Sequence, residues 1–340
     1  MRRTVHILRL GMRDDTIHKV LVTGATGFIG RALRPALLAR GLVVRATTRH
    51  LGRAPRQGGE DWVQADLLRP ETLGPALEGM DAAYYLVHSM GHGGEDYRAR
   101  ERRCAESFAH EAARAGLKRI VYLGGVAPRG TPSHHLESRL AVGELLRAGP
   151  VPTVELRASM IIGPGSTSWL ICRDLALRLP AMVLPTWMRS RTSPIALEDV
   201  VRALTDALEV PLEHGEWFDL PGPEVLSGRD ILERIAARRG LRPLMVRLPV
   251  LTPRLSSLWL KLVTSADYAV ARELVAGLTQ DLLPRDARYF ELTHHPPRIP
   301  FDEAARRTLA AEAAQPAHRR GFAAREEHWV ERLGPHLQRE

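Results

Sequence analysis

A short apolar segment followed by closely spaced glycines most constrains the fold of this chain. Residues 20–22 are apolar, and Gly24, Gly27 and Gly30 follow in a G-x-x-G-x-x-G spacing. This pattern predicts a strand, a tight turn and the first turn of a helix. Gly24 permits the turn, Gly27 lets backbone approach a pyrophosphate, and Gly30 lets the helix pack closely on the sheet. Since a helix N-terminus favours phosphate, we predict a nucleotide-binding turn with contacts from Thr23, Gly24, Thr26, Gly27, Phe28, Ile29 and Gly30.

Apolar strand-like segments alternate with helical patterns after this turn. The strands are expected near 42–49, 62–65, 81–87, 119–123 and 153–157. Such alternation predicts an α/β fold with a doubly wound parallel sheet, the Rossmann architecture. We expect three parts: a flexible N-terminal extension over 1–16, an NAD(P)-binding Rossmann domain over 17–225, and a smaller C-terminal region over 226–340. The last part is expected to be mixed but mainly helical, and to lie on the substrate side.

Two local patterns stand out in the last third of the chain. Ser227 and Asp230 have the spacing of a capping box ahead of a helix. Leu255, Leu258 and Trp259 begin an i, i+3, i+4 apolar stripe, for which core packing is the main interpretation. A substrate pocket or a membrane surface is the alternative for that stripe.

The end of the second predicted strand bears on the choice of cofactor. A site specific for NAD places Asp or Glu there to hold the adenosine ribose 2′-hydroxyl, whereas this chain has Thr48 and Arg49. A guanidinium favours a 2′-phosphate, so we predict NADP(H) as the preferred cofactor and NAD(H) as the alternative. The competing interpretation is that Arg49 is simply another exposed arginine. Asp66 and Leu67 follow the next strand and are expected near the adenine.

Composition argues against several other classes of protein. The net charge is +9, but only three of the 48 basic residues are lysines and the arginines are scattered among acids, so we expect no nucleic-acid binding. Two cysteines are too few for a disulfide framework, and His110-Glu111 does not complete H-E-x-x-H, so no metal site is predicted. We find no membrane-spanning segment and expect a cytoplasmic protein.

Several motifs together resemble the short-chain dehydrogenase/reductase superfamily, in its extended or atypical branch. They are the glycine turn, Asp66-Leu67, residues 121–123, Arg157 with 162–165, and Ile195 with 198–200. Residues 83–90 and 251–257 are similar to bacterial NAD(P)-binding proteins akin to the NmrA-like regulators and to the 39-kilodalton accessory subunit of respiratory complex I. The resemblance covers roughly residues 20–238 and implies a Rossmann fold with a bound dinucleotide.

The same resemblance identifies candidate catalytic positions. Active members of the superfamily resemble one another in using a Tyr-x-x-x-Lys pair with an upstream Ser or Thr. This chain has His135 at the tyrosine position, Arg139 at the lysine position, and Gly124 or Gly125 at the serine position. Arginine still donates hydrogen bonds to a ribose, and imidazole titrates near neutrality. The candidate catalytic residues are therefore His135, Arg139, His88 and Tyr85, with His134 and Tyr97 behind them; further cofactor contacts are expected from Val87, His88, Gly124 and Arg139.

Two functions are compatible with these features. The first is an oxidoreductase that transfers hydride between NADP(H) and a small-molecule carbonyl, alcohol or double bond. The alternative is a dinucleotide-binding protein without turnover, acting as a redox sensor or as an assembly or stability factor with a protein partner. The loss of the Tyr/Lys/Ser set favours the alternative, whereas the substrate-side region favours the enzyme.

Overall fold

A seven-stranded parallel sheet forms the centre of the protein. The structure is a computed structural model, and it describes residues 16–55, 58–88, 95–179, 181–184, 186–247 and 280–314. The strand order is β11-β6-β5-β4-β1-β2-β3, so the predicted doubly wound α/β fold is confirmed. The strands are β1 (Lys19–Val22), β2 (Val43–Thr48), β3 (Asp61–Gln64), β4 (Ala82–Tyr85), β5 (Arg119–Gly125), β6 (Thr153–Ala158) and β11 (Glu216–Asp219).

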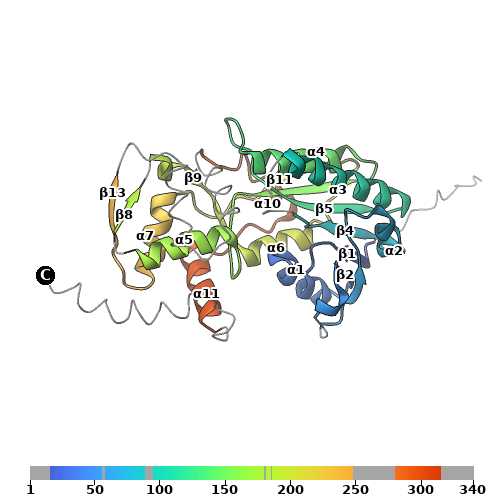
Figure 1. Ribbon diagram of the computed structural model, residues 1–340, viewed down its shortest axis with the longest axis horizontal. Helices are drawn as coiled ribbons and strands as arrows, with labels where there is room; N and C mark the ends of the chain where they lie inside the picture. The colour runs from blue at the N-terminus through green and yellow to red at the C-terminus, as the bar shows by residue number, and fades with distance from the viewer. Residues whose placement is uncertain are drawn as a thin grey trace, which may run out of the picture.

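Helices cover both faces of this sheet (Figure 1). Alternate residues of a strand point to opposite faces, so Val20 and Val22 enter one core and Leu21 enters the other. The first core lies under α1 (Phe28–Ala39), α6 (Leu197–Asp206) and α10 (Arg288–Thr293). The second core lies under α2 (Leu73–Leu77), α3 (Glu95–Arg114) and α4 (His134–Ala148). Short 3₁₀ turns, η1 (Leu51–Arg53) and η2 (Pro70–Thr72), flank β3.

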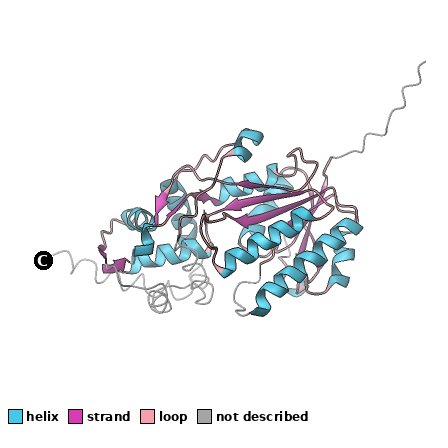
Figure 2. Ribbon diagram, turned by 90° about the horizontal axis from the view of Figure 1, so that it is seen from above, coloured by secondary structure: helices cyan, strands magenta, loops and turns pink. Residues whose placement is uncertain are grey.

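A third core lies beyond the carboxyl ends of the sheet strands, at the left of Figure 1, and forms a second lobe. Its elements are α5 (Thr167–Arg178), β8 (Ala181–Leu184), η3 (Thr186–Arg189), α7 (Gly228–Ala237), β13 (Leu244–Arg247) and α11 (Phe301–Ala313). Three two-stranded sheets are added: β7 (Met160–Ile162) with β10 (Pro194–Ala196), β9 (Arg191–Thr192) with β12 (Leu226–Ser227), and β8 with β13. The chain thus enters this lobe after β6, returns to the sheet for α6 and β11, and then completes the lobe. Figure 2, seen from above, shows the sheet strands in magenta with helices in cyan packed beside them.

Some local predictions can be compared directly with the structure. Ser227 and Asp230 form the predicted capping box at the start of α7. The apolar stripe that begins at Leu255 and the chain after residue 314 lie outside the described residues. Among the described residues, none of the helices has the length and hydrophobicity needed to span a membrane.

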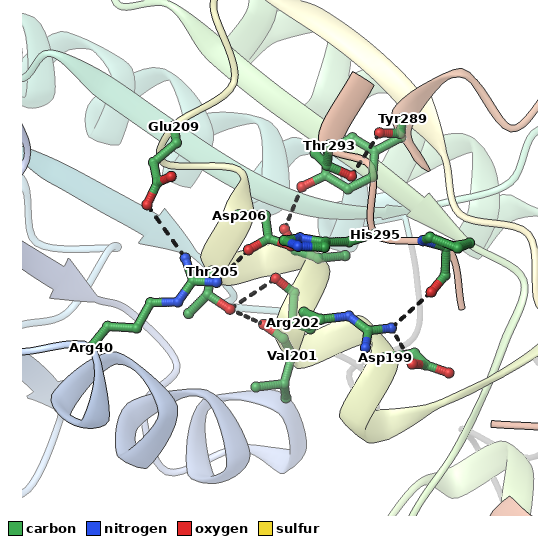
Figure 3. Close-up of polar contacts among 12 residues, drawn as sticks. Arg40, Asp199, Val201, Arg202, Thr205, Asp206, Glu209, Tyr289, Thr293 and His295 are labelled. Carbon is green, nitrogen blue, oxygen red and sulfur yellow. Dashed lines mark hydrogen bonds and ion pairs between the residues drawn. The ribbon is translucent and has the colours of Figure 1, made fainter. Parts of the chain in front are cut away.

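Buried carboxylates tie α6 to neighbouring segments (Figure 3). Asp206 accepts a hydrogen bond from Arg40 at the end of α1, and its other oxygen lies 2.8 Å from Nδ1 of His295. Asp199 accepts the backbone N–H groups of residues 298–299 at 3.1 and 3.0 Å. Because buried carboxylates are stable only when paired, these contacts hold the segment before α11 against α6.

Candidate active site

A cavity of 430 Å³ opens at the carboxyl ends of the central strands. The strand order reverses between β1 and β4, and doubly wound folds bind ligands at such a switch point. The cavity extends from the glycine turn past the ends of β4, β5 and β6 to α5, β8 and α7. The predicted site residues that line it are Gly24, Gly27, Phe28, Ile29, Gly30, Tyr85, Val87, His88, Gly124, His135 and Arg139.

The glycine turn has the geometry that a pyrophosphate requires. Gly24 has φ +61°, and a Cβ there would lie 2.6 Å from the carbonyl oxygen of Leu86. A Cβ on Gly30 would lie 2.5 Å from the carbonyl oxygen of Gly24, so α1 packs against the turn only because position 30 lacks a side chain. Gly27 is the N-cap residue of α1 and no side chain caps this end. The cradle of close backbone with an uncapped helix start fits a dinucleotide phosphate.

Thr23 and Leu67, two predicted cofactor residues, are buried outside the cavity lining. The Thr23 hydroxyl donates to the carbonyl oxygen of Tyr84 (2.9 Å) and accepts the N–H of Leu86 (3.0 Å). It therefore ties β1 to β4. Leu67 packs in the core under α2 and α3.

Thr26, Arg49 and Asp66 also lie outside the cavity lining. Thr26 is exposed in the glycine turn, and Arg49 is exposed directly after β2. The Arg49 guanidinium has no ion-pair partner among the residues that the structure describes, and so it is available to an anion at the end of β2. Asp66 is half-buried, and its Oδ1 accepts the N–H of Leu68 at 3.1 Å.

Two histidines far apart in the sequence meet in the cavity. His88 follows β4, and His135 lies in the first turn of α4, which Ser133 caps. The distance between His88 Nε2 and His135 Nδ1 is 3.1 Å. One of these nitrogens therefore donates a proton and the other accepts it. The contact with His88 uses Nδ1 of His135, so the other ring nitrogen, Nε2, can interact with a bound ligand.

Glu101 extends the histidine pair and is not among the residues predicted from the sequence. Its Oε2 lies 3.3 Å from His88 Nδ1, and its side chain is only 5% exposed. The hydroxyl of Tyr97 lies 3.4 Å from the same nitrogen. A signal was available in the sequence, because Glu101 shares a helical face with the buried Cys104 and Phe108, where a carboxylate is unexpected.

Burial keeps both imidazoles neutral. It lowers the pKa of His135 to about 2; a proton on His88 would act in the same direction, as does the positive charge of Arg139. Burial also lowers the pKa of His88, although its hydrogen bond to Glu101 acts in the opposite direction. At neutral pH each ring therefore carries a single proton, and its position is set by the hydrogen-bond chain.

The nearby phenols are likewise neutral. Burial is the largest cause that raises the pKa of both Tyr85 and Tyr97, and Glu101 in its ionised form raises both further. Tyr85 is 1% exposed and packs edge-on against Phe108 at a centroid distance of 5.0 Å. A phenol in this environment does not ionise at neutral pH.

Because of the histidine burial, we expect stability to fall in acid. Unfolded histidine has a pKa near 6.5, so below that pH the unfolded chain binds a proton that native His135 does not. The stabilisation is therefore complete above about pH 6.5 and is lost at about 1.4 kcal/mol per pH unit below it. In urea unfolding between about pH 6.5 and 5, His135→Gln should show a shallower loss than the parent protein. Exchange of the exposed neighbour, His134→Gln, should leave the slope unchanged; equal slopes in all three proteins would contradict the burial of His135.

Arg139 lies one helical turn beyond His135 and reaches back to the sheet. Its guanidinium donates to the carbonyl oxygen of Leu123, and its own carbonyl oxygen accepts from the Tyr122 hydroxyl at 3.0 Å. Of the described residues that line the cavity, it is the only one with a permanent charge. The remaining donors of the guanidinium can serve a ribose hydroxyl.

The absence of a serine at position 124 has a structural reason. A Cβ on Gly124 would lie 2.8 Å from Oε1 of Glu155, whose side chain is fully buried. That carboxylate cannot swing away easily, because Arg147 and Arg157 each hold it at 2.8 Å. Glu155 therefore occupies the space into which a side chain at position 124 would point.

Comparison with known proteins shows that the chain is similar to NAD(P)H-binding proteins. A family described as NAD(P)H-binding matches residues 24–150. A 3-diazoavenalumate denitrifying reductase of a Streptomyces species is 32% identical over 225 residues, which cover 56% of this chain and 72% of that protein. The ceramide reductase of Caulobacter vibrioides is 28% identical over 242 residues, covering 70% of this chain and 76% of that protein.

Solved structures agree on the fold. The UDP-N-acetylglucosamine 4-epimerase from Bacillus cereus is similar with a TM-score of 0.65 and covers 88% of this chain and 98% of its own. Its sequence is only 14% identical, so the similarity concerns the architecture alone.

Proposed function

The chain belongs to the NAD(P)-binding short-chain dehydrogenase/reductase superfamily, and on that premise we propose that it is an NADPH-dependent reductase acting on a small-molecule carbonyl. One observation carries the proposal: a single cavity joins the glycine turn to the His88–His135 pair. Both relatives named above are reductases, which favours turnover over a sensor or an assembly factor.

The residues around the cavity suit the parts of the cofactor. The glycine turn and the start of α1 would hold the pyrophosphate. Arg139 would hold the nicotinamide ribose, and Arg49 would pair with the 2′-phosphate of NADPH. Bound there, a reduced nicotinamide supplies a hydride, which is two electrons with one proton, to a carbonyl carbon.

The carbonyl oxygen also requires a proton, which His135 can give from Nε2. Glu101, His88 and His135 form a hydrogen-bonded chain. In its proton-loaded form, Glu101 is a carboxylic acid and each imidazole carries its proton on Nε2. His88 Nε2–H then donates to His135 Nδ1, and the Glu101 hydroxyl donates to His88 Nδ1, in agreement with the distances of 3.1 and 3.3 Å.

Proton delivery moves three protons by one position each. The Nε2 proton of His135 goes to the substrate oxygen, the Nε2 proton of His88 goes to His135 Nδ1, and the Glu101 proton goes to His88 Nδ1. Both rings exchange tautomers but remain neutral throughout, as their burial demands. Glu101 ends as a carboxylate. It acts as a positioning residue that orients His88 and stores the proton for His135.

Labelled cofactor tests this function. Purified protein should remove one deuterium stereospecifically from NADPH labelled on one face of C4, in the presence of at least one member of a panel of carbonyl compounds and quinones. Saturable NADPH binding with no turnover on the whole panel would instead support the non-catalytic alternative. If neither NADPH nor NADH binds, both functions are wrong.

The proposed 2′-phosphate contact gives a separate expectation for cofactor choice. Arg49→Ala should weaken NADPH binding by about 10- to 100-fold, because a hydrogen bond to a charged group contributes about 1.5–3 kcal/mol. NADH binding should change by less than about twofold. Fluorescence titration measures both, and Arg242→Ala, which removes an exposed arginine in the second lobe, controls for net charge. Equal losses for the two cofactors would remove Arg49 from the site.

A further inference from the structure

The half of the cavity remote from the glycine turn is walled by the second lobe. We name this half the apolar chamber. Its side chains come from α5, β8, η3 and α7, and they are Ile171, Cys172, Leu175, Met182, Leu184, Met188, Ile231 and Leu232. All except the half-buried Cys172 are at most 9% exposed, so the chamber is a deep extension of the cavity.

We propose that the apolar chamber binds an unbranched hydrocarbon chain carried by the carbonyl compound that the protein reduces. The identity of the reacting end rests on the proposed function, whereas binding of the chain does not. Apolar walls gain free energy in proportion to the apolar area they cover. The cavity is continuous from His135 to Leu232, so the two ends of one molecule can occupy both halves.

Sulfur-containing side chains make these walls adaptable. Met182 and Met188 are unbranched thioethers that fill irregular spaces and rearrange at little cost. Burial raises the pKa of the Cys172 thiol to about 12, so this side chain stays neutral and acts as a small apolar surface. A flexible chain with many conformers suits such walls better than a rigid polycyclic ring does.

The polar residues near the apolar chamber restrict which polar groups its ligand can carry. Thr192 lines the cavity and is 4% exposed, and its hydroxyl has no hydrogen-bond partner among the described residues. It can therefore serve one polar atom beside the chain, and Ser190 also lines the cavity. No Lys, Arg, Asp or Glu side chain from the described ranges lines the chamber. A diphosphate would lie there without the basic partners it needs, so a nucleotide sugar is not the ligand we infer.

A homologous series of methyl ketones tests the chamber without turnover. The protein is saturated with NADP⁺, and each ketone, one methylene longer than the last, is titrated by calorimetry. We expect the dissociation constant to fall about fourfold per methylene until the chamber is full. Met188→Ala enlarges the chamber and should extend this trend to longer ketones. Met245→Ala is the matched control, because Met245 packs in the same core but does not line the cavity.

The outcomes separate this inference from the proposed function. The proposal that the chamber binds a hydrocarbon chain is overturned if the dissociation constant does not depend on chain length. It is also overturned if UDP-glucose binds more tightly than any ketone. Length-dependent binding that persists in His135→Ala supports the chamber whether or not the protein turns over. If short carbonyls are turned over but the dissociation constant does not depend on chain length, the proposed reductase function stands and only the proposed role of the chamber is refuted. The series on the parent protein decides the matter even if Met188→Ala does not fold.

Discussion

His135→Ala is expected to lower kcat by about 10²–10⁴-fold, the range over which a positioned general acid contributes. The reason is that, in the proposed mechanism, His135 is the residue that gives a proton to the substrate oxygen. The dissociation constant of NADPH should change little, because the pyrophosphate cradle lies in the glycine turn rather than at α4. Steady-state kinetics with the best carbonyl of the panel, together with NADPH titration, measures the two effects separately.

Two further variants make the experiment specific to the proton chain. His134→Ala removes the exposed neighbour, whose side chain is 83% exposed, and should leave kcat unchanged. Glu101→Gln keeps an acceptor beside His88 but cannot store a proton, so we expect a smaller loss of kcat and a reduced solvent isotope effect. An unchanged isotope effect would show that Glu101 only supports the fold. Full activity in His135→Ala would remove the histidine from the mechanism.

Gly24→Ala should abolish cofactor binding and weaken the fold. The new Cβ would lie 2.6 Å from the Leu86 carbonyl oxygen and would also hold alanine at φ +61°. The left-handed conformation alone costs about 1–2 kcal/mol for a residue with Cβ, and the clash brings the expected loss of unfolding free energy to about 2–3 kcal/mol. Relief of the clash would shift residues 86–88, so the change would disturb both the phosphate cradle and His88. Urea unfolding and NADPH titration measure the two losses.

Gly41→Ala is a control that distinguishes the effect of backbone strain on stability from an effect on cofactor binding. Gly41 has φ +79°, yet a Cβ there would meet no atom within 4 Å. We expect this variant to lose about 1–2 kcal/mol of stability and to bind NADPH like the parent protein. If Gly24→Ala also binds NADPH normally, the glycine turn is not the phosphate site.

Much of the fold could be predicted from local sequence patterns. The spacing around Gly24 predicts the turn between β1 and α1, since the chemistry of a tight turn lies within a few residues. Strand and helix periodicity predicts the alternation through β6, and the confirmed fold follows from it. The resemblance to the superfamily's Tyr-x-x-x-Lys pair identifies His135 and Arg139. Both line the cavity, since a four-residue spacing puts them on one face of α4.

Contacts between distant segments could not be predicted in the same way. The pairing of Glu101 with His88 depends on how α3 docks against the end of β4, which no spacing records. The apolar chamber is similarly assembled from residues near 171–188 and from α7, with α6 and β11 between them in the sequence. The parallel pairing of β8 with β13 joins segments about sixty residues apart and gives no local signal.

The Glu155 carboxylate on β6, held by two arginines, determines where a hydroxyl side chain could be introduced at the end of β5. At position 124 a serine would require Glu155 to become smaller, and that change would strand the positive charges of Arg147 and Arg157, so no single substitution reaches a stable product. At Gly125 the nearest obstacle is the Cδ1 methyl group of Leu136 at 2.7 Å, which belongs to a movable side chain. An engineer seeking to restore the superfamily's serine therefore has one direct route, through position 125.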